Sequence, residues 1–430
     1  MEPSLNLQDF LKTEPVVSGP THKPLTIPEV GLRQAVLEEL ALKMLYLSGP
    51  FSVLELSKLM RLSFEVANEL LKRLRTEQLC QVTGMSGQIA NLAITSQGRT
   101  RAQEILAQSQ YSGPTPVPLS SYVEQVKKQC VTNVEAHPAD VERAFAQLVL
   151  DSETLWQLGT ALNSGSAIFL YGPPGVGKTT IAETLSRVLA EDHVWLPYAV
   201  EVDGQVITVY DPTVHHRLEN LEPHGHDDRW VLCRRPAVQV GGELTIEMLD
   251  LQYNPATKFY SGPVQMKANN GVLIIDDFGR QRVRPDDLLN RWVVPLDRRI
   301  DFLTLAGGRK IEIPFEMLVV FASNTDPADL VDPAFLRRIQ TKIKLGAVTN
   351  EQFVEIFRRV AAEKDVSYDP DVPLDLVNFI RGSLQQDLRS CYPRDIINQV
   401  CWSARYENRQ PHVDHPSLLR AVEAYFPMSS

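Results

Sequence analysis

A glycine-rich turn between a strand-like and a helix-like segment constrains this chain more than any other feature. It reads Gly172-Pro173-Pro174-Gly175-Val176-Gly177-Lys178-Thr179-Thr180, with the apolar run 167–171 before it and a helical pattern at 181–186 after it. Its glycines allow backbone N–H groups to surround a phosphate at the helix N-terminus, where Lys178 reaches the terminal phosphate oxygens and the Thr179 hydroxyl suits Mg²⁺. A turn that binds nothing would not need a lysine and a hydroxyl side chain directly after its last glycine. We therefore predict that this turn binds a nucleoside triphosphate.

The size and charge of the chain restrict its class. A length of 430 residues predicts two or three domains. The net charge of -10 and the pI of about 5.5 argue against bulk electrostatic binding to nucleic acid or to an anionic membrane. The first residues lack a basic, apolar leader and no run is long enough to span a bilayer, so we expect a cytoplasmic protein without a membrane span.

The cysteines are few and far apart, and none forms a C-x-x-C pair. We expect reduced thiols rather than a disulfide framework or a zinc ribbon. They are Cys80, Cys130, Cys233, Cys391 and Cys401.

Two further apolar runs end in polar side chains that suit nucleotide chemistry. Run 271–275 predicts a buried strand, and Asp276 at its end is placed to hold the hydration shell of Mg²⁺. Run 317–322 predicts a neighbouring strand, after which Asn324 is expected to orient the attacking water and sense the γ-phosphate; a plain turn-forming role is the alternative. Both strands belong with the phosphate loop in a parallel α/β core.

In this order the motifs resemble those of AAA+ ATPases over residues 120–430: Walker A, Walker B at Asp276, a sensor-1 asparagine, an arginine-finger segment and a sensor-2 arginine. The resemblance implies ATP and Mg²⁺ as cofactors and a ring of identical subunits, expected to be a hexamer. It implies that Arg337 or Arg338 reaches the nucleotide of the neighbouring subunit, and that Arg394 reaches the γ-phosphate from the subunit's own lid. The alternatives are an ordinary surface pair and an ordinary first-turn arginine.

The chain departs from that family at Asp277, where a glutamate is usual for polarising the water. The aspartate carboxylate lies one methylene closer to the backbone. Hydrolysis is expected, and slow turnover or a nucleotide-controlled switch stays open as an alternative.

Residues 29–110 show the element order of a winged-helix domain, and 94–99 resembles the wing-to-helix passage of MarR-like proteins. The pattern predicts a helix, a helix-turn-helix, a hairpin and a last helix. The basic and acidic charges of the third helix nearly cancel, so we expect a docking or regulatory role more than contact with DNA. These side chains are Lys72, Arg73, Arg75, Glu65, Glu69 and Glu77.

The segment between the Walker motifs is longer than one strand and one helix require. Parts of it, 235–244 and 268–274, loosely resemble MoxR-like and magnesium-chelatase-like AAA+ proteins. Phe259-Tyr260 has the character of a pore loop, although packing in a core is the favoured interpretation. The histidines at 215, 216, 224 and 226 match no structural zinc spacing, so a metal site there is disfavoured.

The predicted architecture is a three-layer αβα P-loop core with a C-terminal helical lid and an N-terminal winged-helix domain of α+β type. The predicted function is an ATPase that remodels a protein partner, recruited or regulated through the winged helix. The alternative is a DNA-binding regulator switched by nucleotide; a nucleotide kinase would explain neither the arginine pair nor Asn324. The expected boundaries are an arm at 1–28, the winged helix at 29–110, a proline-rich linker at 111–119, the nucleotide-binding domain at 120–346 and the lid at 347–430.

Overall fold

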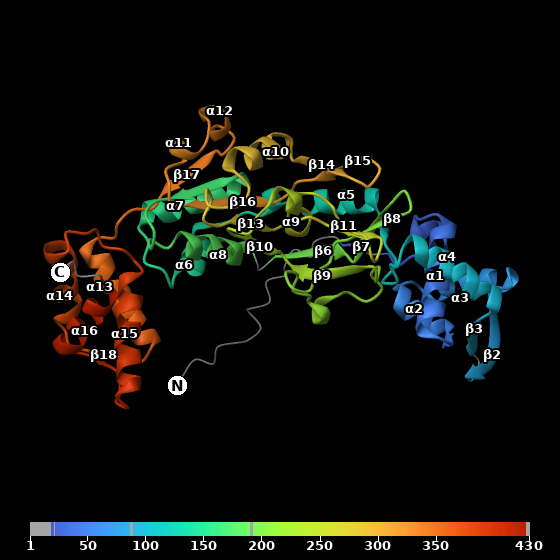
Figure 1. The fold of residues 1–430 in the computed structure, drawn as a ribbon, viewed down its shortest axis with the longest axis horizontal. Coiled ribbons are helices and arrows are strands. Elements are labelled where there is room, and N and C mark those ends of the chain that lie inside the picture. Colours follow the sequence, from blue (N-terminus) through green and yellow to red (C-terminus); the bar gives the residue numbers. More distant parts are fainter. Residues whose placement is uncertain (1–18, 21, 87–88, 190–191, 427–430) are drawn as a thin grey trace, which may run out of the picture.

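The computed structural model describes residues 19–20, 22–86, 89–189 and 192–426. The molecule is elongated, with an N-terminal domain at one end, an α/β core in the middle and a helical domain at the other end (Figure 1). Most of the expected arm, residues 1–18 and 21, lies outside the described residues. The described part of that segment is packed, because Ile27 is buried and the short helix η2 (Pro28–Val30) ends in the buried Val30.

The N-terminal domain combines helices with a β-hairpin. Ser52 and Glu55 form a capping box that begins one helix, and Ser63 caps the next, so three polar residues define where the two helices begin. Between them Arg61 adopts a left-handed φ of 57°, which ends the first of these helices. The elements are α1 (Gln34–Ser48), β1 (Phe51–Ser52), α2 (Val53–Met60), α3 (Phe64–Thr76), β2 (Cys80–Ser86), β3 (Ile89–Ile94) and α4 (Ser96–Gln108).

The core contains a five-stranded parallel sheet, as the apolar runs predict. Every residue of its two central strands β13 and β16 is buried, which is typical of a sheet covered by helices on both faces. The strand order is β10 (Ala237–Val240), β13 (Val272–Ile275), β16 (Leu318–Ser323), β5 (Ile168–Tyr171) and β17 (Thr341–Lys344).

Alternate side chains of these strands point into two separate hydrophobic clusters. Ile168 and Leu170 pack with helices α6, α7 and α8, whereas Phe169 packs with α9 and α10 on the opposite face. This confirms the predicted αβα layering. The helices are α6 (Pro138–Phe145), α7 (Ser152–Ser164), α8 (Lys178–Leu189), α9 (Val264–Ala268) and α10 (Pro285–Arg298).

Much of the long segment between β5 and β13 builds a second sheet beside the N-terminal domain. Its order is β11 (Gln252–Asn254), β12 (Phe259–Ser261), β8 (Gln205–Thr208), β7 (Ala199–Val202) and β4 (Val117–Pro118). Tyr260 of β12 is 2% exposed and Phe259 packs against the N-terminal core, so these aromatics are packing residues. Two strand pairs flank this sheet, β6 (His193–Pro197) with β9 (Trp230–Arg234) and β14 (Ile300–Thr304) with β15 (Lys310–Pro314).

The expected spacer at 111–119 differs from the structure. Val117 and Pro118 form β4, which pairs in parallel with β7 as the edge strand, and the helix α5 (Leu119–Lys128) begins immediately after it. An edge strand tolerates proline because one of its sides needs no N–H donor. The proline-rich segment is therefore part of the core.

The C-terminal domain is helical, with its own hydrophobic cluster. Its elements are α13 (Asn350–Glu363), β18 (Ser367–Tyr368), α14 (Val372–Asn378), η6 (Phe379–Ser383), α15 (Tyr392–Tyr406), β19 (His412–Val413) and α16 (His415–Tyr425). Across the part of the chain that the structure describes, no helix is both long enough and apolar enough to cross a membrane.

Candidate functional site

The glycine-rich loop joins the end of β5 to the start of α8, at the carboxyl edge of the parallel sheet. Gly172, Gly175 and Gly177 all have positive φ angles, of 144°, 81° and 92°. A Cβ on Gly172 would lie 2.0 Å from the carbonyl oxygen of Leu345, and one on Gly175 would lie 2.5 Å from the Cys391 sulfur. The positions of Gly172 and Gly175 therefore require glycine both for the backbone conformation and because a side chain would not fit.

Lys178 lies in the first turn of α8 and is only 8% exposed. Its Nζ donates to the carbonyl oxygens of Gly172 and Pro173, each at 2.9 Å, and to Oδ1 of Asn324 at 2.7 Å. Burial lowers the pKa of Lys178 below its usual range, while the carboxylates of Asp277 and Asp276 oppose that shift. The ammonium is therefore held in the mouth of the loop by three acceptors.

Thr179 and Asp276 bring together the oxygen ligands that Mg²⁺ prefers. The Thr179 hydroxyl lies 3.1 and 3.0 Å from the two carboxylate oxygens of Asp276, which follows β13. The Gln239 amide nitrogen, from β10, lies 3.4 Å from the same carboxylate. One hydroxyl and one carboxylate suit a cation that keeps several waters and takes its remaining ligands from phosphate, so the donor set fits Mg²⁺.

Asp277 and Asn324 connect this oxygen pair to the lysine. The Asn324 side chain donates from Nδ2 to Asp277 at 3.0 Å while its Oδ1 accepts from Lys178. Asp277 has a left-handed φ of 50°, and its N–H donates to the Asp276 carboxylate at 2.9 Å. Its carboxylate is exposed next to the loop, where a water molecule can reach it.

The two arginines after α12 (Pro333–Leu336) have different surroundings. Arg338 is partly buried, and its Nε donates to Asp297 of α10 at 2.9 Å. Its guanidinium also lies 6.0 Å from the centre of the Phe335 ring. Arg337 is exposed and has no ion pair within the described residues. Arg337 is therefore the arginine that points to solvent.

The helical domain touches the phosphate loop directly. The Cys391 N–H and the Ser390 hydroxyl both donate to the carbonyl of Gly175, each at 3.1 Å. Arg394, the predicted lid arginine, instead forms an ion pair with Glu363 of α13 at 3.5 Å. The structure therefore brings the segment before Arg394, but not its guanidinium, against the loop.

Two residues that the sequence analysis did not select lie at this site. Arg389 approaches the loop, since its Cδ is 3.5 Å from the position of a Cβ on Gly175. Gln239 meets Asp276 from a strand that the sequence analysis treated only as part of the insert. The alternating pattern of β10 identifies Gln239 as a polar residue near the end of a strand, whereas Arg389 lies in a loop without a motif.

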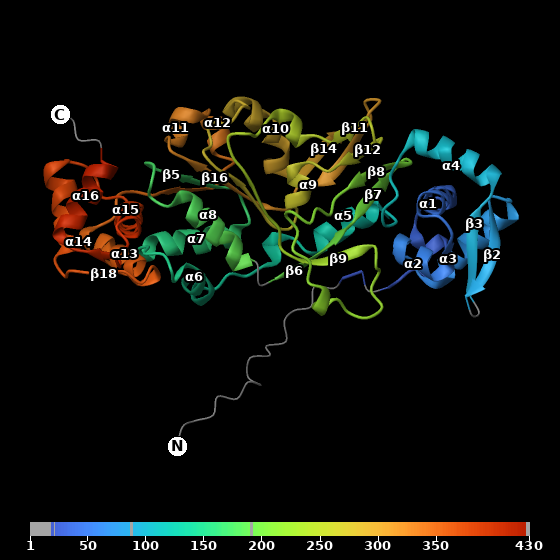
Figure 2. The same ribbon diagram turned by 60° about the horizontal axis from the view of Figure 1, so that its bottom comes forward.

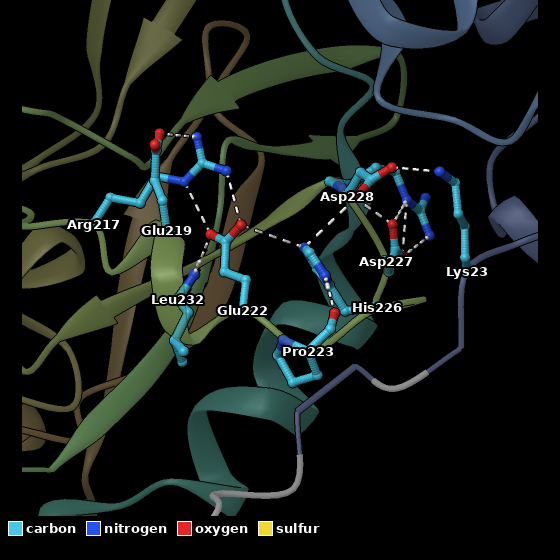
Figure 3. A network of polar contacts seen from close by, with 10 residues as sticks. Lys23, Arg217, Glu219, Glu222, Pro223, His226, Asp227, Asp228 and Leu232 are labelled. Carbon is cyan, nitrogen blue, oxygen red and sulfur yellow. Dashed lines mark hydrogen bonds and ion pairs between the residues drawn. The ribbon is translucent and has the colours of Figure 1, made fainter.

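The histidine-rich segment takes part in a network of hydrogen bonds and ion pairs. Glu222 accepts two hydrogen bonds from Arg217, at 2.9 and 2.8 Å, and lies 3.8 Å from His226 (Figure 3). His215 is buried between the Asp211 N–H and the Lys267 carbonyl, and burial lowers its pKa. Nowhere in the described residues do three or more His, Cys, Asp or Glu side chains gather closely enough to hold a metal.

Residues 349–424 match the family described as a domain of unknown function (DUF8689). No curated protein matches the sequence. The chain is similar to NtrX from Brucella abortus in complex with ADP, at 14% identity and a TM-score of 0.41, over 67% of this chain and 58% of NtrX. It is also similar to the RuvB Holliday junction branch migration motor from Thermotoga maritima, at 14% identity and a TM-score of 0.38, over 64% of this chain and 69% of RuvB.

Proposed function

We propose that this chain is an AAA+ ATPase that binds ATP with Mg²⁺ and hydrolyses it between the subunits of a ring. The observation that carries the proposal is the continuous set of contacts from Thr179 and Asp276, through Asp277 and Asn324, to Lys178 beneath the glycine loop. A structural turn would need none of these side chains in this arrangement.

Each residue has a distinct role in the proposed reaction. The N–H groups of the loop and the Lys178 ammonium bind the β- and γ-phosphates, and Thr179 with Asp276 would hold Mg²⁺, which neutralises phosphate charge when bound. Asp277 accepts a proton from the attacking water, and Asn324 holds that carboxylate in position. Ser390 and Cys391 report occupancy of the loop to the helical domain, because their hydroxyl and N–H donate to the Gly175 carbonyl.

Arg337 is the better candidate for catalysis in the neighbouring subunit. Its guanidinium is exposed, whereas that of Arg338 is tied to Asp297 within the same chain. In mixed rings of Arg337→Ala and Lys178→Ala subunits, some interfaces combine an intact loop with an intact arginine. We expect such mixtures to recover ATPase activity that neither variant has alone. Recovery with Arg338→Ala but not with Arg337→Ala would reverse the assignment.

A protein client is favoured over DNA as the partner of the N-terminal domain. On α3, Arg73 forms an ion pair with Glu69 at 3.0 Å, so that part of the basic character is cancelled within the helix. A DNA-binding helix is expected to present uncancelled basic side chains. Binding of the full chain to duplex DNA that weakens steeply with salt would support the regulator instead.

The central test is Lys178→Ala. Removing the ammonium from the loop should reduce ATP affinity and phosphate release by at least about a hundredfold, because a charge-assisted phosphate contact is lost. Phosphate release and binding of a fluorescent ATP analogue measure both effects. Exchange of the exposed Lys310 for Met is the control. Wild-type phosphate release in Lys178→Ala would refute the proposed function.

A further inference from the structure

A cavity of about 460 Å³ lies between the N-terminal domain and the second sheet of the core. One wall comes from α1 and the end of α4, and the other from the β7–β8 turn and from β11 and β12. Figure 2 shows α1 and α4 beside β7 and β8, in agreement with Figure 1. Two hydrogen bonds frame the cavity, from the Gln110 N–H to the Thr257 carbonyl at 2.9 Å and from Lys258 Nζ to the Ala107 carbonyl. A molecule in this cavity would contact both domains.

The chemistry of the cavity is dominated by Lys43 of α1. This lysine is only 6% exposed, although lysine is almost never fully buried without a partner. Among the described residues its Nζ makes one hydrogen bond, of 3.3 Å, to the carbonyl oxygen of Ser109. Burial lowers the pKa of Lys43 to about 8. An ammonium has three donors, so the cavity holds a cation whose hydrogen-bonding capacity is largely unused.

The acidic side chains of the cavity have other partners. Glu39, whose charge opposes the lowering of the Lys43 pKa, lies 3.7 Å from Arg101 outside the cavity lining, and Asp203 pairs with Arg309, also outside it. Among the residues that the structure describes, Lys258, like Lys43, has a backbone carbonyl as its only hydrogen-bond partner. The lining carries the basic side chains of Arg33, Lys43 and Lys258 against the acidic Glu39 and Asp203, so its charge favours an anion.

Aromatic side chains form the opposite wall. Tyr253 and Tyr260 lie with their ring centres 5.0 Å apart, and Tyr253 is 44% exposed, which leaves part of its ring uncovered. Tyr111 is buried at the domain junction with its hydroxyl bonded to Pro114. Tyrosine rings pack well against flat apolar groups.

We propose that this cavity binds a small molecule with a planar ring and an anionic group, the anion on Lys43 and the ring against Tyr253. The anionic group can be a carboxylate, a sulfonate or a phosphate, because each accepts hydrogen bonds from an ammonium. Such a ligand bridges the two domains and fixes the N-terminal domain on the core. This site is separate from the phosphate loop and does not depend on the proposed ATPase function.

Anilinonaphthalene sulfonate, a fluorescent planar anion, is the probe that tests the proposal on the full chain. We expect saturable binding to the wild type, and a loss of affinity of about tenfold or more in Lys43→Met, the value of one hydrogen bond to a charged group. Tyr253→Ala, at a position that is 44% exposed, should weaken binding severalfold. Wild-type affinity in a folded Lys43→Met protein would overturn the proposal.

Two controls separate this site from general apolar binding. A second cavity, of about 430 Å³ between α6 and α7, is mainly apolar and includes the exposed Trp156. Trp156→Ala should leave the affinity for the probe unchanged, as should Lys310→Met at an exposed strand position. If Lys43→Met does not fold, wild-type affinity in Tyr253→Ala overturns the proposal. A loss of affinity in Trp156→Ala equal to that in Lys43→Met overturns it as well.

Discussion

Asp277 is the residue on which turnover most depends in the proposed site. Its left-handed φ of 50° is a conformation that asparagine and aspartate adopt more readily than other side chains. The Asn324 amide fixes the carboxylate, and the Asp276 carboxylate accepts from its N–H. The position therefore combines a rare backbone conformation with an exposed acid, which is typical of a functional residue.

Asp277→Asn separates binding from hydrolysis. Asparagine keeps the left-handed backbone without strain but cannot accept the proton of a water molecule. We expect ATP affinity to stay within about threefold of wild type while phosphate release falls about a hundredfold or more. Equilibrium binding and steady-state phosphate release measure the two quantities. Wild-type turnover would show that another group polarises the water.

At this scale the sequence predicted the types of residue better than their partners. Lys178 bonds to Asn324, and Thr179 bonds to Asp276. These residues lie together because short motifs at the ends of adjacent strands determine their positions. The partners of Arg394 and Arg338 depend on long side chains that meet helices far away in sequence. No local pattern encodes such contacts.

At the scale of elements, the junction between the phosphate loop and the start of α15 couples the core to the helical domain. Gly175 supplies its carbonyl to both Ser390 and Cys391, and its missing side chain leaves room for the Cys391 sulfur. Movement of either element therefore displaces the other.

Gly175→Ala tests this junction. The new Cβ would lie 2.5 Å from the Cys391 sulfur, and the φ of 81° is strained for alanine by about 1 kcal/mol. We expect about tenfold weaker nucleotide binding and a lower melting temperature. Adding Cys391→Ala removes the steric contact but not the backbone strain, so it should restore part of the affinity. Equal affinities of the two variants would exclude the steric explanation.

The sequence predicted three strands of the parallel sheet but not the second sheet or the role of the proline-rich segment. Buried strands appear as continuous aliphatic runs, so β5, β13 and β16 were recognisable. β4 is only two residues long and contains a proline, and its pairing with β7 joins positions more than eighty residues apart. Composition alone therefore indicated a spacer where the structure has an edge strand.

At the scale of the whole molecule, one buried ion pair connects the N-terminal segment, the proline-rich segment and the core. Arg229 and Asp227 are 5% and 4% exposed and lie 2.7 Å apart. The Arg229 guanidinium also donates to the carbonyls of Val30 at 2.8 Å and Pro116 at 3.5 Å. This arginine fixes both segments that connect the N-terminal domain to the core.

Arg229→Met should destabilise the protein by about 3–5 kcal/mol, because the Asp227 carboxylate would be buried without a counter-charge. Denaturant unfolding followed by tryptophan fluorescence measures the loss. Lys23→Met is the matched control, since its ion pair with Asp228 is one-third exposed and worth less than about 1 kcal/mol. Equal losses in the two variants would contradict the role assigned to Arg229.

The short strand β4 also determines where the α/β core can be cut. A fragment that starts at residue 119 would lack Val117 and Pro118 and would leave β7 as an unpaired sheet edge. Unpaired edges recruit other strands and cause aggregation. An expression fragment of the core therefore needs to begin before residue 117. That start lies within the segment that its composition alone would identify as a linker.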